Sequence, residues 1–218
     1  MPVSRDRILY EDEHLLAVNK LSGELVVRGS GKVDKLPLLD FLKKEYPGLR
    51  TLHRLDFETS GVVVFARTKE AYNQVIDSDF AGWKKFYSAL VMGQIGRKKG
   101  MIRKPLPARS GKGTVEAITH YTVLDHFVNS SFIEAEIATG RHHQIRKHFA
   151  AIKHPLALDQ VYGHEKFNRL FTRELGYRKF FLHAARVEMR HPVTQEQLCI
   201  EAPLPKTFDQ LLKKLRSL

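Results

Sequence analysis

The chain has 218 residues, of which 43% are hydrophobic and 28% charged, a composition typical of a soluble globular protein. Its single cysteine, Cys199, excludes an intrachain disulfide and fits a reducing compartment. The first seven residues are polar and unlike a signal peptide, and no apolar run approaches the roughly 20 residues of a membrane span. We therefore expect a soluble, cytoplasmic protein.

The net charge of +12 is unevenly distributed along the chain. Residues 1–83 carry 12 basic and 13 acidic residues. In contrast, residues 84–113 carry nine basic residues and no acidic one, and residues 139–191 carry 11 basic and 4 acidic ones. Two basic tracts on a nearly neutral body indicate a surface for a polyanion, although a well-solvated basic surface is the alternative.

Apolar periodicity and turn residues predict elements along the whole chain, with Thr68 as the N-cap of one helix. In chain order they are strands over 8–10 and 15–18, a helix over 36–46, a buried strand over 61–66, a helix over 69–80, a strand over 86–92, a glycine-rich basic loop over 97–113, strands over 117–124 and 131–138, a helix within 140–153, a strand over 181–189 and a helix over 208–215. Strands arrive in runs, which favours an α+β fold with a mixed, largely antiparallel sheet flanked by helices. With no repeat or linker, residues 1–218 are predicted to form one domain.

The first segment with candidate chemistry ends where the buried strand over 61–66 begins. Its polar side chains are His53, Arg54, Asp56, Thr59 and Ser60. A rigid strand fixes the geometry of a preceding loop, so a carboxylate there is well placed for catalysis. Taken alone, however, an aspartate beside an arginine is more often a structural ion pair.

The second segment, residues 139–148, is rich in histidine and arginine. His142, His143 and His148 do not match the two-histidine helical zinc motif, and the neighbouring arginines would repel a cation. Gly31-Lys32 and Gly111-Lys112 lack the spacing of a phosphate-binding loop, which disfavours NTP hydrolysis. No Gly-x-Ser-x-Gly elbow occurs, so a Ser-His-Asp hydrolase is also disfavoured. The sequence therefore predicts neither a metal nor a nucleotide cofactor.

Together, the two segments resemble the signature of the RluA family of pseudouridine synthases. The matching blocks, in chain order, are Val18-Asn19-Lys20-x-Ser22-Gly23, His53-Arg54-Leu55-Asp56-x-x-Thr59-Ser60-Gly61, Lys85-Phe86-Tyr87-x-Ala89, Gly140-Arg141-x-His143-Gln144-Ile145-Arg146-x-His148, and a closing region with His154-Pro155, Asp159-x-x-Tyr162-Gly163 and Leu182-His183-Ala184. The resemblance spans residues 8–205. It departs at Leu21, where the family usually has proline, and at Leu158, where it usually has glycine; both affect loop geometry. We also expect the chain to lack the S4-like RNA-binding module of some members.

The resemblance implies a cofactor-free isomerisation of uridine in RNA. Asp56 would be the catalytic carboxylate, acting as nucleophile or base, and attack at C1′, addition to the uracil ring and elimination through a glycal all remain open. Arg146 would pair with Asp56 and keep it charged when the flipped base excludes solvent, and Tyr87 would stack on the uracil. The residues expected to contact RNA are Arg54, His53, Arg141, His143, Gln144 and Ile145.

Two other functions compete with this interpretation. A non-catalytic RNA-binding protein with the same fold would not need Asp56, Tyr87 and Arg146 together. A glycoside hydrolase ordinarily needs two carboxylates, and the nearest partner, Glu58, belongs to no matching motif. The motifs leave the substrate open between ribosomal and transfer RNA, and a monomer is expected.

Overall fold

The computed structural model describes residues 3–28, 35–108 and 111–218. Contacts divide the chain into two compact units, each built from two separate stretches of sequence. The first unit comprises residues 1–85 and 184–204, and the second comprises residues 86–183 and 205–218. The single domain expected from the sequence stays a prediction.

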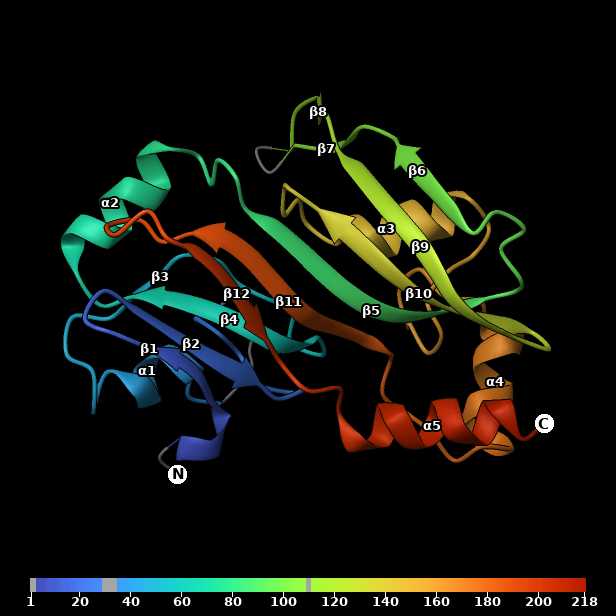
Figure 1. The fold of residues 1–218 in the computed structure, drawn as a ribbon. Helices are drawn as coiled ribbons and strands as arrows, with labels where there is room; N and C mark the ends of the chain where they lie inside the picture. Colours follow the sequence, from blue (N-terminus) through green and yellow to red (C-terminus); the bar gives the residue numbers. More distant parts are fainter. Residues whose placement is uncertain (1–2, 29–34, 109–110) are drawn as a thin grey trace. The chain divides into compact units, whose positions relative to one another are not determined.

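The first unit is an antiparallel arrangement of strands with short helices. Its elements are η1 (Arg5–Arg7), β1 (Ile8–Glu11), β2 (Leu15–Lys20), α1 (Leu38–Leu42), β3 (Arg50–Thr51), β4 (Ser60–Ala66), α2 (Lys69–Asp77), most of β11 (Leu182–Arg190) and β12 (Gln197–Glu201). β1, β2 and β4 lie side by side, with β3 also paired to β4 and β12 to β11 (Figure 1). Thr68 caps α2 as predicted, since its hydroxyl accepts the Ala71 N–H at 3.2 Å.

Strand β4 runs through the core of this unit. All seven of its residues are buried, which explains the continuous apolar run that marked this strand in the sequence. Val62 and Val64 pack in one hydrophobic cluster with Trp83 and with Met189 of β11. The loop that precedes β4 is therefore attached to a rigid element.

The second unit is built on strands of a sheet, two of which form a long antiparallel hairpin. Its elements are β5 (Lys84–Met92), which begins at the end of the first unit, β6 (Lys99–Arg103), β7 (Leu106–Pro107), β8 (Thr114–Val115), β9 (Ile118–Phe127), β10 (Ser130–Ile137), α3 (Gln144–Ala151), α4 (Glu165–Arg173) and α5 (Lys206–Arg216). The strand order is β5-β10-β9-β6, and β7 and β8 form a separate hairpin. Together with the first unit, these elements confirm the predicted α+β class.

The structure differs from the sequence expectations in several places. The helix expected over 36–46 is shorter, and neither β3 nor β12 was predicted. The basic loop predicted over 97–113 is wrong, because β6 pairs with β9 and β7 pairs with β8 in this segment; residues 109 and 110 lie outside the described part. Helix α4 was not predicted, although Phe167 and Phe171 are buried four residues apart, as on one face of a helix. Across residues 3–28, 35–108 and 111–218, no helix is long and apolar enough to span a membrane.

Candidate active site

Asp56 lies in the first unit, on the loop between β3 and β4, and a buried lysine holds this loop in place. The Lys20 side chain is 0% exposed, and its ammonium donates to the carbonyl oxygens of Phe57 at 3.1 Å and Thr59 at 2.6 Å. The same ammonium also donates to the Leu21 carbonyl at 3.1 Å. The Asp56 carbonyl accepts the Thr59 N–H at 3.2 Å. The backbone around the candidate carboxylate is therefore held at several points.

Lys20 also acts on Asp56 through its charge. Burial lowers the pKa of Lys20 to about 8 from an ordinary 10.5, while the carboxylates of Glu24 and Asp56 oppose this shift. A lysine with that pKa is still mostly protonated at neutral pH. Lys20 is thus a positioning residue that orders the loop and places a positive charge near the carboxylate. Sequence reasoning had treated it only as part of a motif.

Gly61, at the end of the Asp56 motif, allows β4 to approach β11. Its φ of 111° lies in a region that favours glycine, and a Cβ added there would lie 2.1 Å from the Ala184 carbonyl oxygen. Any side chain at this position would push the two strands apart. The glycine of the motif is therefore explained by packing.

The two residues before Leu55 point in different directions. Arg54 is exposed, which suits the predicted RNA contact. His53 instead accepts the Val64 N–H of β4 at its Nε2 atom, at 3.1 Å, and its ring packs edge-on against Trp83. Burial, together with the nearby Lys85 ammonium, lowers the pKa of His53 to about 3, so the ring is neutral. The RNA contact expected of His53 gains no support from this position.

Lys85 is a second buried lysine in the first unit, and its environment is aromatic. Its side chain is 6% exposed, and the ammonium lies 5.1 Å from the centre of the Phe80 ring and 5.8 Å from that of Trp83. Burial lowers the pKa of Lys85 to about 8. The two cation–π contacts offset part of the cost of desolvating the ammonium.

We expect Lys85→Met to stabilise the protein at pH 7 by roughly 1–3 kcal/mol, because a desolvated charge is replaced by an apolar side chain of similar length. Lys85 takes up a proton near pH 8 when folded and near 10.5 when unfolded. The unfolded state therefore binds more protons in this window, and wild-type stability rises with pH across it. That rise should be smaller in the variant. Urea unfolding from pH 7 to 10 measures both effects, and Lys84→Met, at the exposed neighbouring lysine, is the control. If Lys85→Met were destabilised and its free energy of unfolding changed with pH as in the wild type, a costly buried Lys85 charge would be ruled out.

Arg146, in the second unit, forms a buried ion pair that the sequence did not predict. Its Nε and Nη2 atoms donate to Asp159 Oδ2 at 2.6 Å and Oδ1 at 2.8 Å, and both side chains are buried. Burial alone would raise the pKa of Asp159, but the Arg146 guanidinium and two backbone N–H groups hold it below its usual value. The expected pair of Arg146 with Asp56 stays a prediction, as does the catalytic role of Tyr87, which is 7% exposed on β5.

Aromatic rings flank this ion pair. The Arg146 guanidinium carbon lies 5.2 Å from the centre of the Tyr162 ring and 5.0 Å from that of Phe180. The Tyr162 hydroxyl lies 3.1 Å from Nδ1 of His143, so the structure brings His143 and Arg146 together around Tyr162. His143 has a positive φ of 55° directly before α3, and its ring stacks on that of His142. Asp159 and Tyr162 appeared in the sequence as motif residues without a role.

Gln144 and Ile145 occupy structural positions. The Gln144 amide accepts from Thr139 and from the Arg141 N–H, and donates to the Ile118 carbonyl and to Thr119. Ile145 is 4% exposed. The RNA contacts expected of these two side chains therefore gain no support, whereas Arg141 is exposed beside them. Gln144 instead connects the loop before α3 to β9.

His148 ties α3 to the basic segment. Its Nδ1 lies 2.9 Å from the Thr119 hydroxyl on β9, and its Nε2 lies 3.0 Å from the Lys104 carbonyl between β6 and β7. The ring is 0% exposed. The last histidine of the second motif thus orders backbone near the basic tract, with both ring nitrogens in contact with neighbouring groups. In the described residues no group of three or more His, Cys, Asp or Glu side chains is arranged to hold a metal ion.

Leu158 shows why one departure from the family motif matters for geometry. Its φ of 63° is one that glycine adopts without strain, and its N–H donates to the Asn168 side chain at 2.7 Å. The leucine side chain is buried next to Asp159. A left-handed conformation in a leucine costs on the order of 1 kcal/mol, which packing and this hydrogen bond must offset.

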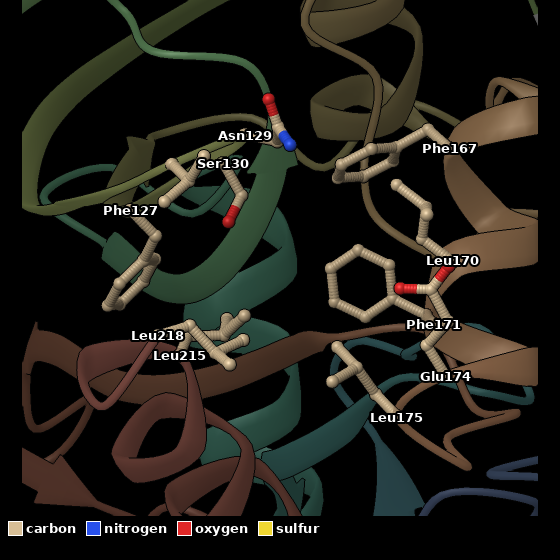
Figure 2. A pocket seen from close by; sticks show the side chains of 11 residues that line it. Phe127, Asn129, Ser130, Phe167, Leu170, Phe171, Glu174, Leu175, Leu215 and Leu218 are labelled. Carbon is tan, nitrogen blue, oxygen red and sulfur yellow. The ribbon is translucent and has the colours of Figure 1, made fainter.

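A small cavity of about 150 Å³ opens in the second unit between the β9–β10 turn, α4 and α5 (Figure 2). Its lining is mostly apolar, with Phe127, Phe171 and Leu218 among the contributors, and Glu174 is its one carboxylate. None of the predicted catalytic residues lines it. It lacks the convergent polar groups of a catalytic pocket, and we do not assign the reaction to it.

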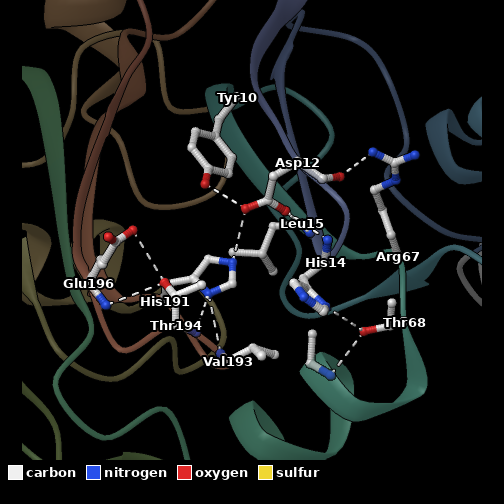
Figure 3. A network of polar contacts seen from close by, with 11 residues as sticks. Tyr10, Asp12, His14, Leu15, Arg67, Thr68, His191, Val193, Thr194 and Glu196 are labelled. Carbon is white, nitrogen blue, oxygen red and sulfur yellow. Dashed lines mark hydrogen bonds and ion pairs between the residues drawn. The ribbon is translucent and has the colours of Figure 1, made fainter.

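A partly buried polar network braces two turns of the first unit (Figure 3). The Asp12 carboxylate accepts the Tyr10 hydroxyl at 2.5 Å and the N–H groups of His14 and Leu15 at 2.8 and 2.7 Å. His191 Nε2 lies 3.0 Å from the same carboxylate, although it is not aligned for a hydrogen bond. Burial and the contact with Asp12 raise the pKa of Tyr10 to about 12. Asp12 accepts two backbone N–H groups, and His191 Nδ1 accepts those of Val193 and Thr194. This aspartate–histidine pair therefore stabilises the fold.

Comparisons with known proteins agree with the motifs. A family model described as RNA pseudouridylate synthase matches residues 14–151. The chain is 33% identical to the ribosomal large subunit pseudouridine synthase C of Vibrio vulnificus, covering 98% of this chain and 70% of that protein. It is 36% identical to the protein of the same name from Escherichia coli strain K12, covering 97% and 70%.

Solved structures extend the likeness to the fold. The human RNA pseudouridylate synthase domain containing 4 protein superposes with a TM-score of 0.80 at 27% identity, covering 97% of this chain and 93% of that one. The human domain containing 1 protein gives a TM-score of 0.73 at 25% identity. The chain therefore belongs to the RNA pseudouridylate synthase family and is an RNA-modifying isomerase, as its RluA-type motifs predicted.

Proposed function

We propose that this protein isomerises specific uridines of ribosomal RNA to pseudouridine, with Asp56 as the catalytic carboxylate. The observation that carries this proposal is the Asp56 loop, which a buried lysine and a rigid strand hold in one geometry. Positioning of this kind is needed by a group that reacts and is unnecessary for a surface ion pair. The relatives named for the large ribosomal subunit favour ribosomal over transfer RNA.

In the proposed reaction, the bond between uracil N1 and ribose C1′ breaks and a bond between C5 and C1′ forms. The proton at C5 is lost and N1 gains one, so the reaction is redox-neutral and is proposed to need no cofactor. Asp56 acts as nucleophile or base on one of the three routes named above. The target uridine leaves its stack at a cost of a few kcal/mol. In this proposal the exposed Arg54 grips the RNA beside the vacated position.

The basic residues supply the remaining RNA contacts. β6 and the segment after it carry several of the lysines and arginines of residues 84–113, and Arg141 is exposed before α3. We propose that these groups bind phosphates flanking the target. The cytoplasmic location and the monomeric state expected from the sequence also remain predictions.

Release of tritium from RNA labelled at uridine C5 tests the activity, because formation of the C5–C1′ bond displaces that atom. The substrates are ribosomal and transfer RNA from a strain that lacks the gene. We expect the purified protein to release tritium from ribosomal RNA and to restore the missing pseudouridine in sequence-resolved mapping. Release from transfer RNA alone would overturn the assigned substrate, and no release from either would favour a non-catalytic RNA-binding protein.

A further inference from the structure

An exposed aromatic ring directly follows Asp56 in the chain. Phe57 is 36% exposed, and Leu21 is 49% exposed. The Leu21 and Phe57 carbonyls accept from the same Lys20 ammonium, so their backbones are neighbours. Single exposed apolar residues are common on protein surfaces, whereas two neighbouring ones beside a candidate catalytic residue suggest a contact surface.

The backbone of Phe57 is held rigidly although its ring is exposed. The Phe57 carbonyl accepts two hydrogen bonds, from the Lys20 ammonium at 3.1 Å and from the Gly23 N–H at 2.8 Å. The tip of the ring lies beside Gly23, where a Cβ would be 4.0 Å from Cζ, so no side chain covers it there. A preorganised ring loses little conformational freedom when a ligand packs on it.

A lysine completes the arrangement. The Lys35 ammonium lies 5.5 Å from the centre of the Phe57 ring. An aromatic ring with an adjacent ammonium can accept both parts of a nucleotide, because the base stacks on the ring and the phosphate attracts the charge. The same pair is poorly suited to an apolar protein partner, which would have to desolvate the lysine.

We propose that Phe57 is a stacking platform for the nucleobase adjacent to the target uridine, and that Lys35 binds the phosphate of that nucleotide. The inference rests on the proposed function, because it takes Asp56 as the residue at which the target base arrives. Removal of the uridine from its stack leaves a neighbouring base with an uncovered face. Phe57 is one residue from the carboxylate and is therefore placed to cover that face.

The test uses a short synthetic RNA centred on the mapped uridine, with the full-length protein. We expect Phe57→Ala to raise KM roughly five- to a hundredfold, the range that loss of one base–aromatic stack represents. Phe57→Leu should show a similar loss, since it keeps apolar bulk without a ring, and Phe57→Trp should remain close to wild type. Ile76→Ala, which removes an apolar side chain that is 41% exposed on α2, is the matched control and should not change KM.

Abasic substitutions then identify the stacked base. Two RNAs are compared, one lacking the base on the 5′ side of the target and one lacking the base on its 3′ side. For the RNA that lacks the stacked base, the wild-type and Phe57→Ala proteins should have equal KM values. The inference is overturned if Phe57→Leu binds as well as wild type, or if the ratio of the two KM values is the same with and without either flanking base. Thermal unfolding of each variant shows whether a loss reflects folding. Tritium release by the wild-type protein on the intact RNA decides the proposed function separately.

Discussion

Asp56→Asn should lower the rate of tritium release by at least about a thousandfold, because asparagine can act neither as the nucleophile nor as the base. The turn should persist, since the Asp56 backbone carbonyl that accepts the Thr59 N–H is kept in the variant, and thermal unfolding of the variant checks this. We expect RNA binding to persist, so the loss should appear in kcat and not in KM. Single-turnover tritium release with saturating enzyme measures the chemical step directly.

Glu58→Gln is the matched control for this variant. Glu58 is an exposed carboxylate two residues further along the same loop. It would be the second carboxylate if the protein were a glycoside hydrolase, so the proposed mechanism predicts nearly full activity for Glu58→Gln. An active Asp56→Asn protein, or an inactive Glu58→Gln protein with normal thermal stability, would contradict the assignment of Asp56 as the single catalytic carboxylate.

Asp159→Asn should destabilise the protein by about 3–5 kcal/mol at pH 7, because it leaves the buried Arg146 guanidinium without its counter-ion. The pKa of Asp159 is lower in the folded than in the unfolded protein, so the ion pair stabilises at pH values above about 4. Its contribution is lost as the pH falls through the folded pKa. The difference between wild type and variant in urea unfolding should therefore shrink towards acidic pH.

The exposed pair of Lys213 and Asp209 on α5 offers a control with the same substitution in the same unit. Their side chains are 71% and 45% exposed, and the atoms lie 2.7 Å apart. Asp209→Asn should change the free energy of unfolding by less than about 0.5 kcal/mol. The double variant Asp159→Asn, Arg146→Met should recover part of the lost stability, since no unpaired charge remains buried. Equal effects of Asp159→Asn and Asp209→Asn would show that burial does not govern the strength of the Arg146 pair.

Local patterns in the sequence predicted most of the helices and strands. The buried strand predicted over 61–66 is the fully buried β4, and the strand predicted over 131–138 is β10, which buries Ile133, Ala135 and Ile137 on one face. Hydrophobic period and composition are properties of neighbouring residues, so they predict a helix or strand without knowledge of the rest of the chain. The basic segment over 97–113 was misjudged because its strands depend on pairing with β9, a contact between residues distant in sequence.

The sequence by itself determined the family, the α+β class and Asp56 as the candidate carboxylate. Motifs and hydrophobic periodicity depend only on residues that are close together in the sequence. Only the tertiary structure showed that Lys20 holds the Asp56 loop and that Arg146 pairs with Asp159. It also showed that His53 and Gln144 face inward, where sequence had placed them against RNA. The physical reason is that a polar side chain looks the same in sequence whether it meets solvent, a substrate or a buried partner. Burial decides between these, and burial depends on which distant segments fold against the residue.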